Sequence, residues 1–277
     1  MVAALISLGF TSVLPENNFR LLVHQNRSNI SEEQFDSALE KIKQAYEPVI
    51  KDRGAELVIL KDWMDTTVNA YAFRENNQWY ISFYGGMARH SEMTEDGFLL
   101  TACHAIGHHL GGFPRVEWSS VEANADYFST LKCLRRIWSN GDSIEVVAKM
   151  EIDRPVKEKC EKQWKKELDQ AICMRSAMAG KSLARLLSVL VGEDSFPEFR
   201  APDETVVTKT NESHINSQCR LDTYFQGALC DADWKIPAGE NDPNSGACRF
   251  RHVGGRPACW YYEKPTFSIS QFEKFIF

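Results

Sequence analysis

The residues of this sequence with the clearest chemical meaning are His104 and His108, in the stretch 101–112. Side chains four residues apart on a helix project from the same face, about one turn from each other. Two imidazoles in that arrangement can bind one metal ion through their ring nitrogens. The spacing therefore predicts two ligands of a metal site on one helix.

The residue that follows the first of these histidines is Ala105. In the His-Glu-x-x-His motif of zinc proteases, this position holds the glutamate that acts as general base. The spacing of the ligands is thus present, while a methyl group replaces the catalytic carboxylate. A functional interpretation has to account for both features.

A third ligand is expected, because catalytic zinc takes three protein ligands and leaves one position for water. Glu122 is the best candidate, since it opens the next predicted helix, over residues 119 to about 138. Asp126 lies one turn further on the same face, where it can hold a ligand imidazole by a hydrogen bond. The sequence therefore predicts a Zn²⁺ site of His104, His108 and Glu122, supported by Asp126.

Four short motifs follow one another in this part of the sequence: Asn-Ala-Tyr at 69–71, Ile-Ser-Phe-Tyr-Gly-Gly at 81–86, His-x-x-Gly-His at 104–108 and Glu-x-x-Ala-Asp at 122–126. Together they resemble the gluzincin metallopeptidases, especially the CAAX-prenyl-protease and heat-shock membrane protease type. The resemblance covers about residues 60–135 and implies an α+β fold with a zincin-like core, in which His104, His108 and Glu122 bind zinc. The gap from His108 to Glu122 is closer to that of compact soluble relatives than to that of the membrane members.

The resemblance implies a mechanism that Ala105 interrupts. In such an enzyme the glutamate takes a proton from the water that attacks the peptide carbonyl, then passes it to the leaving amine. The expected function is zinc-dependent endopeptidase activity on a peptide or protein substrate, nearly abolished in the sequence as it stands. Two explanations compete: a Glu→Ala change that preserves the zinc site, or a natural pseudoprotease that acts as a zinc- or peptide-binding module.

Two further elements of a protease site are expected elsewhere in the chain. The oxyanion stabiliser of such enzymes is often a Tyr, His or Arg side chain. The later chain offers four candidates that the sequence does not rank: His214, Tyr224, His252 and Tyr261. The strand predicted at 78–84 would bind a peptide as an added strand through Trp79, Ile81 and Phe83 if it is an exposed edge. The alternative is an ordinary hairpin strand with aromatic packing.

Simpler interpretations of the same residues remain open. Seven histidines in 277 residues sometimes fall four apart by chance, so the pair can belong to the core or cap a helix. Glu122 can be the third residue of a capping box begun by Ser119, with Asp126 on the surface. The metzincin pattern, by contrast, fails because Pro114 occupies the position of its third histidine.

The composition limits the classes of partner. A hydrophobic content of 43% and a charged content of 25% are ordinary for a globular protein. The net charge of −6 gives no electrostatic reason to expect nucleic acid or an anionic membrane as partner. The sequence also contains no apolar run of the roughly 18 residues that a transmembrane helix needs.

The eight cysteines form an even set without a Cys-x-x-Cys pair, which suggests disulfides and an exported protein, periplasmic or secreted. Cys103 points about 100° away from His104 on a helix, so packing or a disulfide is expected there rather than metal binding. From about residue 193 the sequence becomes rich in Pro, Gly, Asp, Asn and Cys. We expect a zincin-like domain over 1–192 and a cysteine-rich, loop-rich extension over 193–277 packed on it.

Hydrophobic periodicity and capping residues predict the elements that carry these groups. The predicted strands are 19–24, 56–60, 69–73 and 78–84, and the predicted helices are 32–53, 94–110, 119–138 and 156–190, the last with a break near Gly180. The apolar stretch 1–10 has no basic residue before it and no clear cleavage site. It is therefore expected to belong to the mature fold rather than to a signal peptide.

Overall fold

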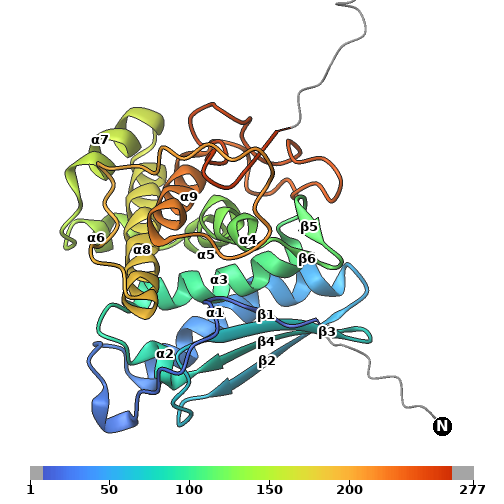
Figure 1. Ribbon diagram of the computed structural model, residues 1–277, viewed down its shortest axis with the longest axis vertical. Helices are drawn as coiled ribbons and strands as arrows, with labels where there is room; N and C mark the ends of the chain where they lie inside the picture. The colour runs from blue at the N-terminus through green and yellow to red at the C-terminus, as the bar shows by residue number, and fades with distance from the viewer. Residues whose placement is uncertain (1–8, 264–277) are drawn as a thin grey trace, which may run out of the picture.

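Four strands form one mixed sheet along one side of the molecule (Figure 1). The computed structural model describes residues 9–263. The strands lie in the order β1 (Thr11–Ser12), β3 (Ala70–Glu75), β4 (Gln78–Tyr84) and β2 (Glu56–Asp62). β3 pairs with β1 and β4 in antiparallel fashion, while β2 pairs with β4 in parallel. The predicted hairpin and the strand predicted at 56–60 are confirmed.

Two long helices, α1 (Glu32–Lys51) and α3 (Glu95–Leu110), pack against this sheet, and the remaining helices gather on the far side of α3 (Figure 1). These are α4 (Glu122–Phe128), α5 (Leu134–Trp138), α6 (Ser143–Val147), α7 (Arg154–Gln163), α8 (Glu167–Val191) and α9 (Ser217–Leu229). Shorter elements are α2 (Gly85–Ala88), the 3₁₀ turn Val23–Gln25, the π-helical turn Ser129–Cys133 and the hairpin of β5 (Arg115–Val116) and β6 (Ser119–Ser120). The protein is thus a mixed α and β structure with a small sheet.

Helix α3 is the centre of this arrangement. It begins as predicted at Thr94, whose hydroxyl accepts a hydrogen bond of 3.0 Å from the backbone N–H of Gly97. Every residue from Gly97 to Leu110 is buried, because the sheet covers one side of the helix and α4 and α8 cover the other. A Cβ at Gly107 would lie 2.8 Å from the carbonyl oxygen of Ala125 in α4. This glycine therefore allows α3 and α4 to approach closely, which brings their polar residues together.

Four disulfides stabilise the chain: Cys103–Cys133, Cys160–Cys173, Cys219–Cys259 and Cys230–Cys248. They confirm that the cysteines are paired and that Cys103 is bonded to another cysteine. Disulfides persist in oxidising compartments, so they suggest an oxidising, extracellular environment for this protein. The first three bonds each involve a cysteine on one of the helices α3, α8 and α9.

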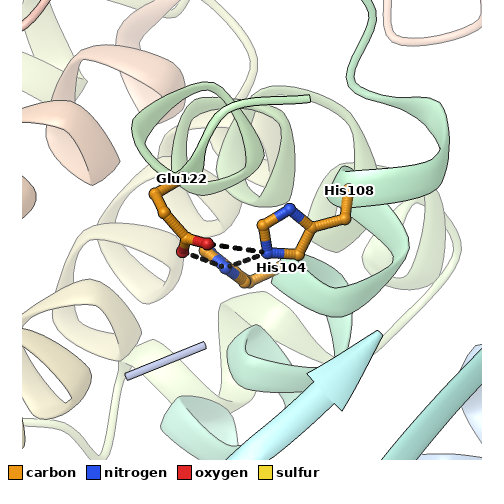
Figure 2. A group of neighbouring side chains, drawn as sticks. All are labelled: His104, His108 and Glu122. Carbon is orange, nitrogen blue, oxygen red and sulfur yellow. Dashed lines mark hydrogen bonds and ion pairs between the residues drawn. The ribbon is translucent and has the colours of Figure 1, made fainter. Parts of the chain in front are cut away.

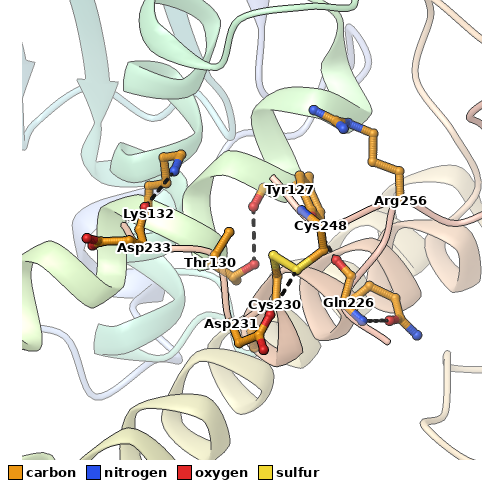
Figure 3. Close-up of a disulfide and its surroundings, with 12 residues drawn as sticks. Tyr127, Thr130, Lys132, Gln226, Cys230, Asp231, Asp233, Cys248 and Arg256 are labelled. Atoms are coloured by element: carbon orange, nitrogen blue, oxygen red, sulfur yellow. Dashed lines mark hydrogen bonds between the residues drawn. A yellow bond between two sulfur atoms is a disulfide. The ribbon is translucent and has the colours of Figure 1, made fainter. Parts of the chain in front are cut away.

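The fourth disulfide belongs to a cluster that fastens the loops after α9 to the helical core (Figure 3). Beside Cys230–Cys248, the hydroxyl of Tyr127 in α4 donates to the carbonyl of Gly254 at 2.5 Å and accepts from the N–H of Cys248 at 3.3 Å. The ammonium of Lys132 donates to two backbone carbonyls of the same loops. Because this loop-rich segment has few apolar side chains, buried hydrogen bonds hold it against the helices.

Two of the predicted elements are wrong. The segment 19–24 forms only one isolated bridge, from Arg20 to Thr67, and then a 3₁₀ turn. Its apolar side chains Phe19, Leu22 and Val23 are exposed, and only Leu21 is partly buried against the core, so the segment lacks the continuous buried face of a strand. The apolar segment is only a few residues long, which is too short to determine which strand it would pair with.

The predicted break near Gly180 is also wrong, because α8 continues through it and the helical region is interrupted earlier, between α7 and α8. A Cβ at Gly180 would lie 2.5 Å from the Cβ of Tyr224 in α9. The glycine therefore serves close packing between two helices instead of ending one. This contact places the side chains of α9 near the centre of the molecule.

The predicted division at residue 193 stays a prediction. Helix α9 lies after it, yet packs against α8 and α4 as closely as the earlier helices do. Residues 1–8 of the apolar N-terminal stretch lie outside the described residues. Among the helices of residues 9–263, none has the length and apolar character required to cross a membrane.

Candidate metal centre

His104 and His108 of α3 converge with Glu122 of α4 (Figure 2). The Nε2 atoms of the two histidines are 2.9 Å apart. The carboxylate of Glu122 lies 3.3 Å from Nε2 of His104 and 3.5 Å from Nε2 of His108. Both histidine side chains are fully buried and that of Glu122 is 11% exposed, so the group has its limited access to solvent on the side of the glutamate.

The other ring nitrogens determine the tautomers of both histidines. Nδ1 of His104 donates to the carboxylate of Asp126 at 2.6 Å, the partner that the sequence predicts. Nδ1 of His108 donates to the backbone carbonyl of Ser120 at 3.0 Å. Neutral imidazoles held in this way carry their lone pairs on Nε2. Two lone pairs that face each other at 2.9 Å repel unless a cation, either a metal ion or a proton, lies between them.

The carboxylate of Glu122, the third member of the group, also lacks a hydrogen-bond donor. Oxygen Oε2 of Glu122 is buried and has no hydrogen-bond partner among the described residues. In a tetrahedral zinc site with bonds near 2.1 Å, neighbouring ligand atoms are about 3.4 Å apart. The three separations of 2.9, 3.3 and 3.5 Å lie close to that value. His104, His108 and Glu122 could therefore hold a metal ion.

The carboxylates of this site are anionic at neutral pH. Burial raises the pKa of Glu122, but the nearby imidazoles of His108, His104 and His214 outweigh it and lower the pKa to about 2. Burial is likewise outweighed for Asp126, where Arg220 and His104 lower the pKa to about 2. Glu122 could therefore bind a metal ion, and Asp126 can accept a hydrogen bond from His104, without either carboxyl group first losing a proton.

The two histidines respond to burial in opposite ways. Burial lowers the pKa of His108 to about 4, and His104, when it is protonated, lowers this pKa further. Burial also disfavours the charged form of His104, but the charge and hydrogen bond of Asp126 outweigh it and raise the pKa of His104. Asp126 thus makes His104 the more basic of the two imidazoles, which would strengthen its bond to a metal ion.

Helix α9 supplies a set of supporting residues that the sequence does not reveal as a group. Arg220 donates to Asp126 at 3.0 Å, and Tyr224 donates to the same carboxylate oxygen at 2.5 Å. Arg220 and Tyr224 are four residues apart, so they share one helix face. Only this spacing could have pointed to them, because nothing in the sequence reveals that α9 packs against α4. Ser120 was missed for the same reason.

The four oxyanion candidates have different positions. Nδ1 of His214 lies 3.5 Å from Oε2 of Glu122, and its side chain is 26% exposed. Tyr224 is buried and engaged with Asp126. His252 is exposed, and Tyr261 packs against Trp260 and Phe250 in another cluster. The structure therefore leaves His214 as the candidate that borders the three ligands on their more open side.

Two of the simpler interpretations are wrong. Ser119 does not cap α4, because the N-cap residue is Val121, and the Ser119 hydroxyl lies 3.0 Å from Nδ1 of His108 instead. Asp126 is 1% exposed rather than on the surface. Both residues contact one of the two candidate ligand histidines, so the capping-box and surface explanations do not account for them.

The expectation that the strand at 78–84 binds substrate as an edge strand is also wrong. β4 is paired on both sides, with β3 and with β2, so its backbone groups are already used within the sheet. Trp79, Ile81 and Phe83 face the core and are at most 8% exposed. Their alternation predicts a strand with one buried face, but not the position of that strand in the sheet.

Ala105 is fully buried on α3. Of the carboxylates in this centre, Glu122 faces both histidines and Asp126 is tied to His104 and Arg220. Neither is free to act as the general base.

Comparisons of the chain with protein-family models, with curated proteins and with solved structures find no match.

Proposed function

We propose that this protein is a zinc metallopeptidase of gluzincin type in which Ala105 leaves little or no hydrolytic activity. The observation that carries the proposal is the convergence of two imidazole lone pairs and an unpartnered buried carboxylate, at distances suited to one tetrahedral metal ion. The order of the motifs around it supports the choice of peptidase. The four disulfides support an exported protein.

Each residue of the centre has a role in this proposal. His104, His108 and Glu122 would bind the metal, while Asp126 and Ser120 fix the two imidazole rings through their Nδ1 atoms. Zinc held there would polarise a peptide carbonyl and lower the pKa of water. His214, on the open side of Glu122, would donate a hydrogen bond to the oxygen on which charge develops.

The step that fails is proton transfer. A glutamate at position 105 would accept the proton of the attacking water, whereas the methyl group of Ala105 cannot. A specific observation also supports a second candidate function. Every other member of the centre is present and well supported, so the protein can act as a zinc- or peptide-binding module without cleavage. Both candidate functions require the metal site. They differ in whether a glutamate at position 105 would produce peptide hydrolysis.

Metal content tests the shared part of the proposal. Elemental analysis of the purified protein after zinc loading and desalting should give about one zinc per chain. The His108→Ala variant should lose it, whereas the control His252→Ala, which changes an exposed histidine outside the centre, should retain it. A folded protein that takes up no zinc, or a His108→Ala variant that keeps it, would contradict the proposal.

Restoring the base separates the two candidate functions. The Ala105→Glu variant should hydrolyse a library of unstructured peptides roughly 10²–10⁴-fold faster than the unchanged chain, the usual contribution of a general base. The gain should disappear in the double variant Ala105→Glu, His108→Ala. A zinc-loaded, folded Ala105→Glu protein without hydrolysis would reject the peptidase and favour the binding module.

A further inference from the structure

A second polar site lies beyond the C-terminal end of α3. Here a cavity of about 660 Å³ is bordered by three arginines, Arg53, Arg74 and Arg115, and by two indole rings. We call it the arginine pocket. None of the three candidate metal ligands lines it, and it meets the metal centre only through Ser120, whose carbonyl holds His108. A cavity of this size lies in the range of small-molecule binding sites.

The guanidinium of Arg74 is the central group of the arginine pocket. Its Nε donates to Nδ1 of His109 at 3.2 Å, and its Nη2 donates to the carbonyl of the same residue at 3.0 Å. These bonds use one edge of the guanidinium and leave Nη1 without a protein acceptor among residues 9–263. No carboxylate within the described chain forms an ion pair with Arg74. The side chain is therefore a half-buried cation whose free end borders a cavity.

Aromatic rings hold this cation in place. The centre of the Arg74 guanidinium lies 3.7 Å from the ring centroid of Trp79 and 5.1 Å from that of Trp118. His109 stacks on both indoles, with centroids 5.2 and 5.1 Å apart. Nε2 of His109 donates to the carbonyl of Tyr80 at 3.1 Å, which fixes the ring. A guanidinium fixed in this way loses little conformational freedom when it binds a ligand.

The charges around Arg74 also favour an anion. Glu240 is shared between Arg53 at 3.1 Å and Arg115 at 3.4 Å, so one carboxylate serves two cations. Glu117 also borders the pocket and is exposed to solvent. Burial, followed by the charges of Arg115 and Arg53, lowers the pKa of Arg74 to about 10, which still leaves it charged at neutral pH. Three cations thus face two carboxylates, with the most buried cation unpaired.

We propose that the arginine pocket binds a small ligand through an oxyanionic group, a carboxylate or a phosphate, that pairs with the free end of Arg74. Both groups offer acceptor oxygens that match the donors of a guanidinium. Arg53 and Arg115 raise the local potential and Glu240 holds them at the rim. This site is separate from the proposed metal centre and does not require that centre to bind zinc.

Isothermal titration calorimetry of the full chain with glutarate and, separately, with inorganic phosphate tests the proposal. Each titration is run in a low-salt buffer without other oxyanions, up to about 20 mM, since weak sites of this kind bind in the millimolar range. The variants are Arg74→Gln and Arg115→Gln, with Arg200→Gln as the control for an exposed arginine outside the pocket. Each variant is compared with the unchanged chain by circular dichroism to confirm its fold.

We expect saturable binding of at least one of the two anions, weakened tenfold or more by Arg74→Gln, several-fold by Arg115→Gln and not by Arg200→Gln. Binding of glutarate alone would identify a carboxylate ligand, and binding of phosphate alone a phosphate ligand. No saturable binding of either anion, or equal affinity in a folded Arg74→Gln variant, would overturn the proposal.

A second experiment separates this proposal from the metal centre. The same titrations are repeated with EDTA-treated protein and with the His108→Ala variant. Binding should persist in both, because the arginine pocket contains no metal ligand. Binding that requires added zinc would place the anion at the metal centre and reject the arginine pocket as its site.

Discussion

The candidate metal centre, called the metal centre below, and the arginine pocket both lie along the second half of α3, yet they are built in opposite ways. At the metal centre His104, Asp126 and Arg220 are buried and joined to one another by hydrogen bonds and an ion pair. Four buried atoms of the centre nevertheless have no hydrogen-bond partner among the described residues: Oε2 of Glu122, Oδ2 of Asp126, Nδ1 of His214 and Nη1 of Arg220. In the arginine pocket Arg74 has no carboxylate partner within the described chain, and Arg53 and Glu240 are partly open to solvent. The first arrangement holds charges in a fixed geometry, and the second leaves a charge available.

The two sites also differ in how much space the protein leaves for a ligand. Among the unpartnered groups of the metal centre, Oε2 of Glu122 and the facing imidazole nitrogens lie within one small volume that suits a single ion. The arginine pocket offers a cavity of about 660 Å³, with one fixed guanidinium and considerable open space. A closed site selects its ligand by geometry, whereas an open site selects its ligand first by charge.

The largest expected difference between the two sites is in stability. Arg220→Met leaves the buried carboxylate of Asp126 without its cation, which should lower the free energy of unfolding by roughly 3–5 kcal/mol. Arg74→Met removes a half-buried cation, its contact with the indoles and its two hydrogen bonds to His109, which should cost roughly 2 kcal/mol. Urea denaturation of the oxidised protein, with metal removed by chelator, measures both. Equal losses would show that the arginine pocket is as interlocked as the metal centre.

The next effect is that of zinc on stability. Zinc at 100 times its dissociation constant should raise the free energy of unfolding by about 2.7 kcal/mol. Asp126→Asn should weaken zinc binding roughly 10–100-fold, because the imidazole of His104 loses its anionic support. Arg74→Gln should leave zinc binding unchanged. Thermal unfolding at a series of free zinc concentrations gives these affinities, and a loss in Arg74→Gln would mean that the two sites are coupled.

The smallest effect is that of salt. An increase in sodium chloride from about 0.05 to 0.5 M should weaken anion binding in the arginine pocket several-fold, because charges near solvent are screened. Zinc affinity should change less, since its ligands are buried and bind the ion directly. Calorimetric titrations at the two salt concentrations compare the sites. An anion affinity that does not respond to salt would contradict the electrostatic account of the pocket.

The sequence alone determined the local parts of the metal centre. The spacing of His104 and His108 reflects the helix repeat over a single turn, and Glu122 and Asp126 follow the same rule on the next helix. The cap at Thr94 and the hairpin of β3 and β4 are equally local and were also predicted. Such features depend on neighbours a few residues away, so backbone geometry is enough to infer them.

The tertiary structure decided what lies beside these local parts. Arg220 and Tyr224 reach Asp126 only because α9 packs against α4, and β4 is an inner strand only because β2 pairs with it in parallel. The arginine pocket joins residues as distant as Arg53, Arg74 and Glu240. These contacts depend on which surfaces meet after the chain has folded. A local pattern does not encode that choice, because many pairings would bury its apolar face equally well.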